Sequence, residues 1–277
     1  MAGHLTNRYN VKVFNRTINK SQKWIQEFNG QISNSINEVV KNADVVITCL
    51  LDDQSLQETI FQPQKTIFDF MKSNSIFIDH TTASYSLTCK LAKLAEQKKI
   101  IIFDAPTSGG KIGAEKGNLS IMVGGNQNKF NFIKPILSCY AHSISFIGKN
   151  GSGQLAKIAN QICVAGIFQG LAEAIHFIKK TGLDGKIVIE ALSQGAAQSW
   201  QMNHRAMQML TEKFDIQATV DMFLKDLRIC LKESENFNLK LPMTQSTEKY
   251  FHLLHENGWG YDDCATLIRL FDQHLIP

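Results

Sequence analysis

Short runs rich in β-branched and aromatic residues recur through the first half of the chain, separated by segments with helical spacing. Stretches such as 21–28 and 86–98 have this helical composition and spacing. Strands that alternate with helices form a parallel sheet covered on both faces, so this half predicts a doubly wound α/β domain. The predicted strands are 11–15, 44–50, 75–79, 100–104, 119–123 and 143–147.

The pattern changes after Gly148. The remaining residues contain no convincing strand and several long amphipathic segments, the first of which extends from about Ser152 to Lys180. At ~1.5 Å per residue this helix is over about 40 Å long. Because 277 residues exceed the ~100–200 usual for one domain, we expect two: residues 1–148 form the α/β domain and residues 149–277 an all-helical domain.

Composition excludes several classes of function. The net charge of +4 is spread along the chain, without the basic and aromatic stripe of a nucleic-acid groove. No apolar run reaches the ~18 residues of a membrane span, and the first residues lack the apolar stretch of a signal peptide. Six cysteines lie far apart without a CxxC pair and read as reduced thiols. We therefore expect a cytoplasmic protein with no nucleic-acid or membrane partner.

No metal site is expected. His252 and His255 are one helical turn apart, but no third ligand stands at zinc-site spacing.

A glycine-rich segment follows the fourth predicted strand. Residues 103–125 read FDAPTSGGKIGAEKGNLSIMVGG, in which Ser108, Gly109 and Gly110 come first. Glycines after a parallel strand let backbone N–H groups approach a ligand at the carboxyl edge of the sheet. On this pattern alone, an ordinary connecting loop remains the commoner alternative.

The start of the long helix carries a second group of polar residues. Gly151-Ser152-Gly153 precede Lys157, which Asn160 and Gln161 follow within one turn. A lysine beside an apolar helix face usually extends to solvent. Held near a substrate oxygen, however, its ammonium can donate a proton as a hydride reaches carbon, and the neighbouring amides can bind a carboxylate or carbonyl.

Together the two segments resemble the β-hydroxyacid dehydrogenase family over nearly the whole chain. The family's DAPVSGG loop matches Asp104–Gly110, and its GxGxxxKxxN pattern matches Gly151–Asn160. The resemblance implies a nicotinamide-dependent oxidoreductase for a small β-hydroxyacid or semialdehyde, built as a homodimer or homotetramer. It also implies that Lys157 is the general acid/base, that the Ser-Gly-Gly turn binds the substrate carboxylate, and that Asn160 and Gln161 orient the substrate. Imine reduction, a related activity, is disfavoured because those relatives generally lack the lysine.

Further positions resemble the family's cofactor contacts. Leu50 and Leu51 stand where its Leu-Pro backbone meets the dinucleotide, although Leu51 departs from the usual proline. Thr82 matches a cofactor-binding threonine and Lys225 a lysine of the helical domain. Without the resemblance, Thr82 is a common helix cap and Lys225 an ordinary surface charge.

The first predicted strand ends in Asn15-Arg16-Thr17. An NAD-specific Rossmann unit places Asp or Glu here for the ribose hydroxyls. Arg16 instead offers a guanidinium to a 2′-phosphate, with Thr17 as a hydroxyl donor, so we expect NADP to be favoured over NAD.

One family feature is missing from the printed sequence. Members open with a strand and a GxGxMG turn that directs a helix N-terminus at the pyrophosphate, whereas Met1–Leu5 resembles the interior of the following helix. We expect a Rossmann-like sheet without its first central strand. Two alternatives stay open: an enzyme whose start lies further upstream, and a non-catalytic remnant that keeps the helical dimerisation domain.

Overall fold

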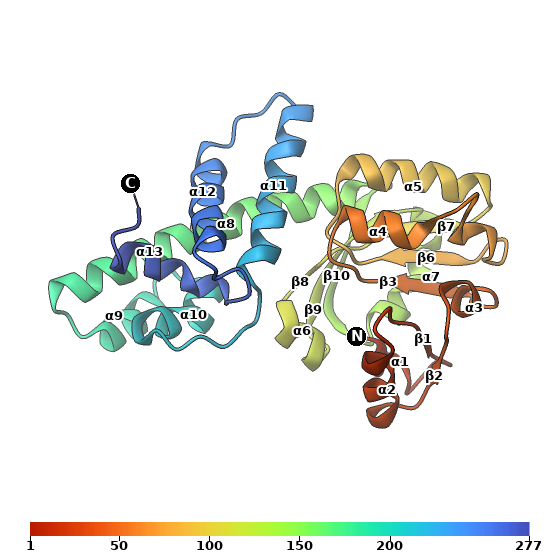
Figure 1. Ribbon diagram of the computed structural model, residues 1–277, viewed down its shortest axis with the longest axis horizontal. Helices are drawn as coiled ribbons and strands as arrows, with labels where there is room; N and C mark the ends of the chain where they lie inside the picture. Colours follow the sequence, from red (N-terminus) through yellow and green to blue (C-terminus); the bar gives the residue numbers. More distant parts are fainter. Residues whose placement is uncertain (277) are drawn as a thin grey trace. The chain divides into compact units, whose positions relative to one another are not determined.

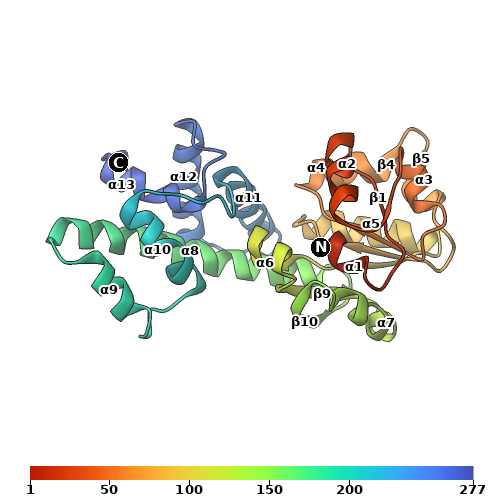
Figure 2. The same ribbon diagram turned by 90° about the horizontal axis from the view of Figure 1, so that it is seen from below.

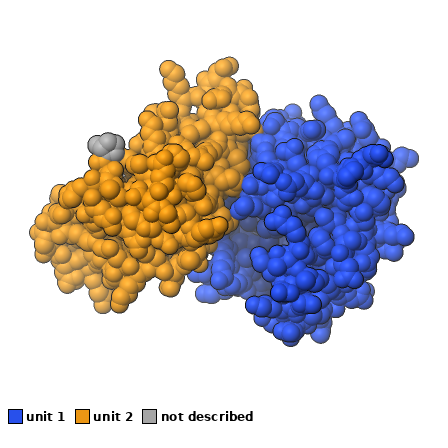
Figure 3. Space-filling view, viewed as in Figure 1, with its two compact units in different colours: residues 1–157 blue, residues 158–277 orange. Residues whose placement is uncertain are grey.

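The computed structural model describes residues 1–276. It divides into two compact units, Met1–Lys157 and Ile158 onward, which are coloured separately in Figure 3. The division falls inside a continuous helix, α8 (Ser152–Thr181), whereas the predicted boundary at residues 148 and 149 lies just before that helix. The first turn of α8 therefore belongs to the α/β unit.

The main sheet of the first unit contains every predicted strand but the first. Its order is β10-β9-β7-β6-β3, and β8 pairs with β9. The strands are β3 (Val45–Thr48), β6 (Ile76–Asp79), β7 (Ile101–Asp104), β8 (Thr107–Ser108), β9 (Leu119–Gly125) and β10 (Ala141–Gly148). Strands β3, β6 and β7 are parallel, and so are β9 and β10, but β9 is antiparallel to β7. The sheet is thus parallel-rich, which confirms the predicted fold class, and its one antiparallel step in the main strand order is between β7 and β9. The chain continues from β7 into β8 and turns through α6 (Gly110–Lys116), so β9 returns alongside both strands.

A second, smaller sheet forms near the start of the chain. Strands β1 (Lys12–Val13) and β2 (Gln31–Ile32) pair in parallel and are not hydrogen-bonded to the main sheet, in which β3 is the end strand. The short helix α1 (Ala2–Leu5) precedes β1, in agreement with the helical reading of these residues. A two-residue hairpin, β4 (Phe61–Gln62) with β5 (Lys65–Thr66), was not predicted.

Helices cover both faces of the main sheet (Figure 1). Alternation along β6 divides its side chains: Ile76 and Ile78 pack with α7 (Gln127–Leu137), and Phe77 packs with α4 (Asp53–Ile60) and α5 (Tyr85–Gln97). Burial of the strand on both sides explains its continuous apolar run. The remaining helices of this unit are α2 (Ile18–Glu27), α3 (Ile36–Val40) and η1 (Ile67–Asp69).

The second unit is helical, and its described residues contain no strand beyond one isolated bridge between Thr219 and Asp263. Its core includes the rings of Phe168, Phe223 and Phe251, which contact one another edge to face. Besides α8, the helices are α9 (Gly185–Leu192), α10 (Trp200–Thr211), α11 (Val220–Asn236), α12 (Pro242–Glu256), η2 (Cys264–Leu267) and α13 (Ile268–Asp272), seen from two sides in Figures 1 and 2.

Helix α8 has the predicted extent and ends as predicted, because Gly182 follows it in the left-handed region with φ +74°. Contrary to the expectation from the sequence, its length and composition alone would allow it to cross a membrane. Side chains from Ala165 to Ile178 along one of its faces are buried in the core of the second unit, which is the role of a core helix.

A buried ion pair holds the second unit together. The guanidinium of Arg205 donates from Nε to Oδ1 of Asp263 over 2.8 Å, and both side chains are almost fully buried. Backbone N–H groups of Gln217, Ala218 and Ala265 also donate to this carboxylate. Burial opposes the charge of Asp263, but Arg205 outweighs it and the pKa lies below its ordinary value.

Candidate active site

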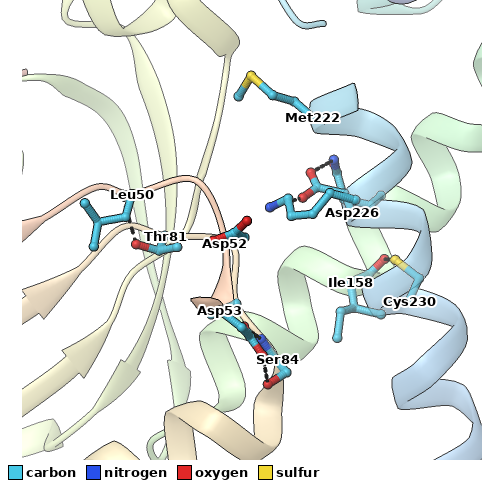
Figure 4. Close-up of polar contacts among 12 residues, drawn as sticks. Leu50, Asp52, Asp53, Thr81, Ser84, Ile158, Met222, Asp226 and Cys230 are labelled. Atoms are coloured by element: carbon cyan, nitrogen blue, oxygen red, sulfur yellow. Dashed lines mark hydrogen bonds and ion pairs between the residues drawn. The ribbon is translucent and has the colours of Figure 1, made fainter. Parts of the chain in front are cut away.

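Two loops at the carboxyl ends of β3 and β6 are hydrogen-bonded to each other. The backbone N–H of Leu50 donates to Oγ1 of Thr81 over 3.0 Å, and Ser84 donates to Asp53 from both its backbone and its hydroxyl (Figure 4). These bonds place Leu50 and Thr82, both predicted cofactor contacts, on one fixed edge of the sheet. The side chain of Leu51, the third predicted contact in these loops, is exposed.

Two carboxylates are buried where β6 and β7 end. Asp79 and Asp104 are direct neighbours in the strand register, and each is at most 3% exposed. Burial raises the pKa of Asp79 to about 6, against hydrogen bonds from Thr81 and Thr48. Burial also raises the pKa of Asp104. Neither carboxylate makes an ion pair within residues 1–276.

Asp104 holds the start of α8. Its Oδ1 accepts from the N–H of Gly151 over 2.7 Å, and its Oδ2 accepts from that of Gln154 over 3.1 Å. A Cβ on Gly153 would stand 2.5 Å from the carbonyl oxygen of Met122 and 2.7 Å from that of Asp104. The second glycine of the GxG pattern, Gly153, therefore has a steric reason, because the helix begins in direct contact with two strands.

Gln154 attaches this helix to the loop after β6. Its side chain is fully buried, its Nε2 donates to the carbonyl of Thr81 over 2.7 Å, and its Oε1 accepts from the N–H of Ala83 over 3.2 Å. The amide thus satisfies backbone groups on both sides of Thr82.

Lys157 lies one turn further along α8. Its side chain is buried, with 7% of the residue exposed, and the residue ends the first unit. A buried ammonium on a helix whose start is fixed by Asp104 and Gln154 meets the positional requirement for an acid/base group. It does not extend to solvent as a typical surface lysine would.

The second unit contains the next polar residues of α8 in a linked set. Asn160 donates to Oε1 of Gln161 over 2.8 Å, and Gln161 donates to Oδ2 of Asp226 over 2.6 Å. Lys225 pairs with Oδ1 of Asp226 over 2.6 Å. Gln161 and Lys225 therefore meet at the carboxylate of Asp226 on α11, and Asn160 joins them through Gln161. Figure 4 labels Asp226.

The Ser-Gly-Gly turn lies between β8 and α6. Ser108 is the last residue of β8 and is partly buried opposite Ser120 of β9. Gly109 and Gly110 follow with φ of +126° and +58°, a backbone that side chains other than glycine rarely adopt. The turn belongs to the first unit, like Lys157.

The segment after β1 is exposed. The N–H of Thr17 donates to Oδ1 of Asn15 over 2.9 Å, which forms a tight turn around Arg16. The guanidinium of Arg16 makes no ion pair with any described residue and is exposed. It is therefore open to an external anion.

Three supporting residues were not predicted from the sequence: Asp104 as a helix anchor and Gln154 in the first unit, and Asp226 in the second. A signal existed for the first, because IFID and IIFD both end buried strands in aspartate. Asp226 adjoins the predicted Lys225. Gln154 carries no such signal, since a glutamine in a helix is ordinarily a surface residue.

These groups fit a nicotinamide dinucleotide. The carboxyl edge of a parallel sheet is where α/β folds bind such ligands. Here that edge presents an apolar side chain at Leu51 and a hydroxyl at Thr82, and the loop after β1 presents a cation at Arg16. Within the described chain, no group of three or more His, Cys, Asp or Glu side chains is arranged to hold a metal ion.

Known proteins match both units. Residues 1–148 match the family model described as the NAD binding domain of 6-phosphogluconate dehydrogenase, and residues 151–271 match the NAD-binding model of NADP-dependent 3-hydroxyisobutyrate dehydrogenase. An uncharacterized oxidoreductase of Shewanella frigidimarina is 38% identical, over 98% of this chain and 93% of its own. The 2-hydroxy-3-oxopropionate reductase of Escherichia coli is 30% identical, over 85% of this chain and 80% of its own. The fold matches that of 3-hydroxyisobutyrate dehydrogenase from Mycobacterium tuberculosis, with a TM-score of 0.87 and 22% identity over 100% of this chain and 94% of that one.

Fold, site and relatives define an NAD(P)-dependent oxidoreductase of hydroxyacids. The chain belongs to the β-hydroxyacid dehydrogenase family, as its two sequence motifs indicated.

Proposed function

We propose that this chain is an NADP-dependent dehydrogenase or reductase for a small β-hydroxyacid or short semialdehyde, and that Lys157 is its general acid/base. The observation that carries the proposal is the burial of Lys157 on a helix anchored at the carboxyl edge of the sheet by Asp104 and Gln154. The relative named 2-hydroxy-3-oxopropionate reductase supports this substrate class.

The nicotinamide, when bound, supplies or accepts the hydride at the carbon of the substrate. In reduction, the ammonium of Lys157 gives its proton to the carbonyl oxygen, which becomes the hydroxyl group. In oxidation, neutral Lys157 takes the proton from the hydroxyl as the hydride leaves its carbon. The side chains of Asn160 and Gln161 orient the substrate, while Ser108, Gly109 and Gly110 bind its carboxylate.

The cofactor side uses the loops described above. Arg16 binds the 2′-phosphate of NADP with help from Asn15 and Thr17, because a guanidinium is a strong phosphate partner. Leu50, Leu51 and Thr82 contact the dinucleotide from the sheet edge. Lys225 is a further cofactor contact, as its match to the family's lysine implies. The matched description of an NADP-dependent enzyme supports this preference.

We further propose a cytoplasmic homodimer or homotetramer assembled through the helical unit. Large apolar side chains exposed on α8 and α9, among them Phe177 and Ile187, support such an assembly.

Substitution of Lys157 by alanine tests the catalytic role. We expect Lys157→Ala to lower kcat about 10²–10⁴-fold, which is the usual contribution of a positioned acid/base, with cofactor affinity unchanged. The measurement is NADPH oxidation against a panel of semialdehydes, glyoxylate and 3-oxoacids. Lys180→Ala, an exposed lysine on the same helix, is the matched control and should leave kcat unchanged. Near-normal turnover by Lys157→Ala would exclude the lysine from the reaction.

Substitution of Arg16 by aspartate tests the cofactor preference. Loss of a charge-assisted hydrogen bond worth ~1.5–3 kcal/mol should shift the NADPH over NADH preference by about 10–100-fold toward NADH. Lys20→Asp makes the same charge change on an exposed residue of α2 and should not alter the ratio. The assignment of Arg16 is wrong if the unsubstituted protein already uses NADH better than NADPH.

A further inference from the structure

The side chain of Gln154 connects two parts of the site that the proposed reaction uses separately. One is the loop after β6, which holds Thr82. The other is the first turn of α8, which holds Lys157. All of these residues lie in the first unit, and the amide of Gln154 makes both of its hydrogen bonds to the loop backbone, at Thr81 and at Ala83.

The connection is specific. Gln154 is fully buried, so any amide hydrogen bond that it lost could not be replaced by solvent. Its donor and acceptor hold the residues immediately before and after Thr82, which fixes that short backbone segment at both ends. Thr81 in turn accepts from the N–H of Leu50, so the same loop is tied to the other predicted cofactor loop.

The helix end of the connection is equally fixed. Asp104 accepts from the N–H groups of Gly151 and Gln154, which prevents the first turn of α8 from sliding along the strand ends. Lys157 follows Gln154 by three residues, and residues at this spacing share one helix face. The loop at Thr82 and the turn that carries Lys157 are therefore held to each other through Gln154, so that ordering of one reaches the other.

We propose that Gln154 is a positioning residue that couples cofactor binding at the Thr82 loop to the placement of Lys157. This inference rests on the proposed function, because it takes Thr82 as a cofactor contact and Lys157 as the acid/base. When NADPH contacts the loop, Gln154 transmits the ordering of residues 80–84 to residues 152–157.

Hydrogen exchange measured by mass spectrometry tests the coupling without relying on turnover. In the unsubstituted protein, NADPH should slow exchange in 80–84 and also in 152–157, by roughly tenfold or about 1.4 kcal/mol. In Gln154→Met, which fills a similar volume without either hydrogen bond, NADPH should still slow exchange in 80–84 but no longer in 152–157. Gln154→Leu, a second apolar side chain of similar size without either hydrogen bond, should give the same result and replaces the methionine variant if that variant does not fold.

Thr247→Val is the matched control for a lost buried hydrogen bond. Thr247 of α12 is fully buried, and its hydroxyl donates to Oε1 of Gln169 over 2.8 Å within the helical unit. This variant should lower thermal stability while NADPH still protects both segments. Its kcat should remain normal, whereas kcat of Gln154→Met should fall about 10–100-fold, as expected when a reacting group is misplaced.

The outcomes separate the inference from the proposed function. Protection of 80–84 without protection of 152–157 in the unsubstituted protein overturns the coupling alone. Equal protection of both segments in Gln154→Met and the unsubstituted protein also overturns it. No protection of 80–84 refutes the proposed cofactor loop, and the inference falls with it. Normal turnover by Lys157→Ala refutes the catalytic role, whatever the exchange data show.

Discussion

Each unit buries an aspartate that accepts hydrogen bonds from backbone N–H groups near the start of a helical segment, but only one of the two carboxylates is paired with a cation among the described residues. In the helical unit, Asp263 is paired with the guanidinium of Arg205, and its pKa lies below the ordinary value. In the α/β unit, Asp104 receives N–H groups of Gly151 and Gln154 but makes no ion pair with any described residue, and burial raises its pKa.

The difference separates two uses of a buried carboxylate. An aspartate with an arginine partner is a closed structural element, because its charge is compensated within the core. An uncompensated carboxylate at the carboxyl edge of a sheet lies where ligands bind and where pKa values are commonly perturbed. The neighbouring Asp79 shares this property. The helical unit thus uses its buried charges for stability, and the α/β unit keeps its own next to the residues proposed for catalysis.

The largest effect on stability should come from removing one partner of the ion pair between Arg205 and Asp263. Arg205→Ala leaves Asp263 buried without a cation, which typically lowers the free energy of unfolding by about 3–5 kcal/mol. Urea denaturation followed by the fluorescence of Trp200 and Trp259, in a Trp24→Phe background, reports on the helical unit. Arg228→Ala, which removes the exposed pair with Glu248, is the control and should lose no more than about 1 kcal/mol. Equal losses in the two variants would contradict the structural role assigned to Arg205.

The sequence predicted the regular part of this architecture well. The strand positions and the long helix from Ser152 follow from periodicity, which local burial imposes along the chain. It could not predict that β9 reverses direction, because that depends on how the chain turns through the short helix after Ser108.

Motifs identified the predicted site residues, but they did not show which residues hold these side chains in place. Lys157 and the Ser-Gly-Gly turn stand in patterns long enough to recognise. The roles of Asp104, Gln154 and Asp226 depend on contacts with residues distant in the chain, such as Gln154 with Thr81. A polar residue buried by tertiary contacts looks in sequence like one exposed to solvent, so these roles required the structure.

Removal of the charge at Asp104 should have a smaller effect on stability than loss of Arg205. Asp104→Asn leaves no uncompensated charge, but it replaces one acceptor with an amide N–H that faces another donor, which should lower the free energy of unfolding by about 2 kcal/mol. The loss should appear as faster native-state hydrogen exchange in the first turn of α8, with exchange around Asp263 unchanged. A loss as large as that of Arg205→Ala would mean that Asp104 is also a compensated structural charge, and would remove the contrast between the units.

The smallest predicted effect concerns the pH dependence of the α/β unit. Burial raises the pKa of Asp79 in the folded protein to about 6. Its contribution to the free energy of unfolding is therefore full at pH values below the pKa of this aspartate in the unfolded chain, and it is lost as pH rises through about 6. Burial lowers the pKa of the adjacent His80 to about 4, although the hydrogen bond to the carbonyl of Ala105 favours the protonated ring. The contribution of neutral His80 to the free energy of unfolding is present at pH values above the pKa of this histidine in the unfolded chain, and it is lost as pH falls through about 4.

Asp104, whose pKa burial also raises, is replaced by asparagine in every variant compared, so that Asp79 and His80 remain as the buried pair. Between about pH 4 and pH 6 their contributions have opposite signs, so the free energy of unfolding of the α/β unit should change little in Asp104→Asn. The further substitution Asp79→Asn removes one of them. The stability of this variant should then rise with pH as His80 alone dictates, by about 1 kcal/mol between pH 5 and pH 6, since one proton contributes at most ~1.4 kcal/mol per pH unit. Urea denaturation at the two pH values, followed by Trp24 fluorescence, measures the slope. In the double variant Asp79→Asn, His80→Gln, the free energy of unfolding should again change little between the two pH values. A slope that persists in the double variant would show that other groups, and not this buried pair, set the pH dependence of the unit.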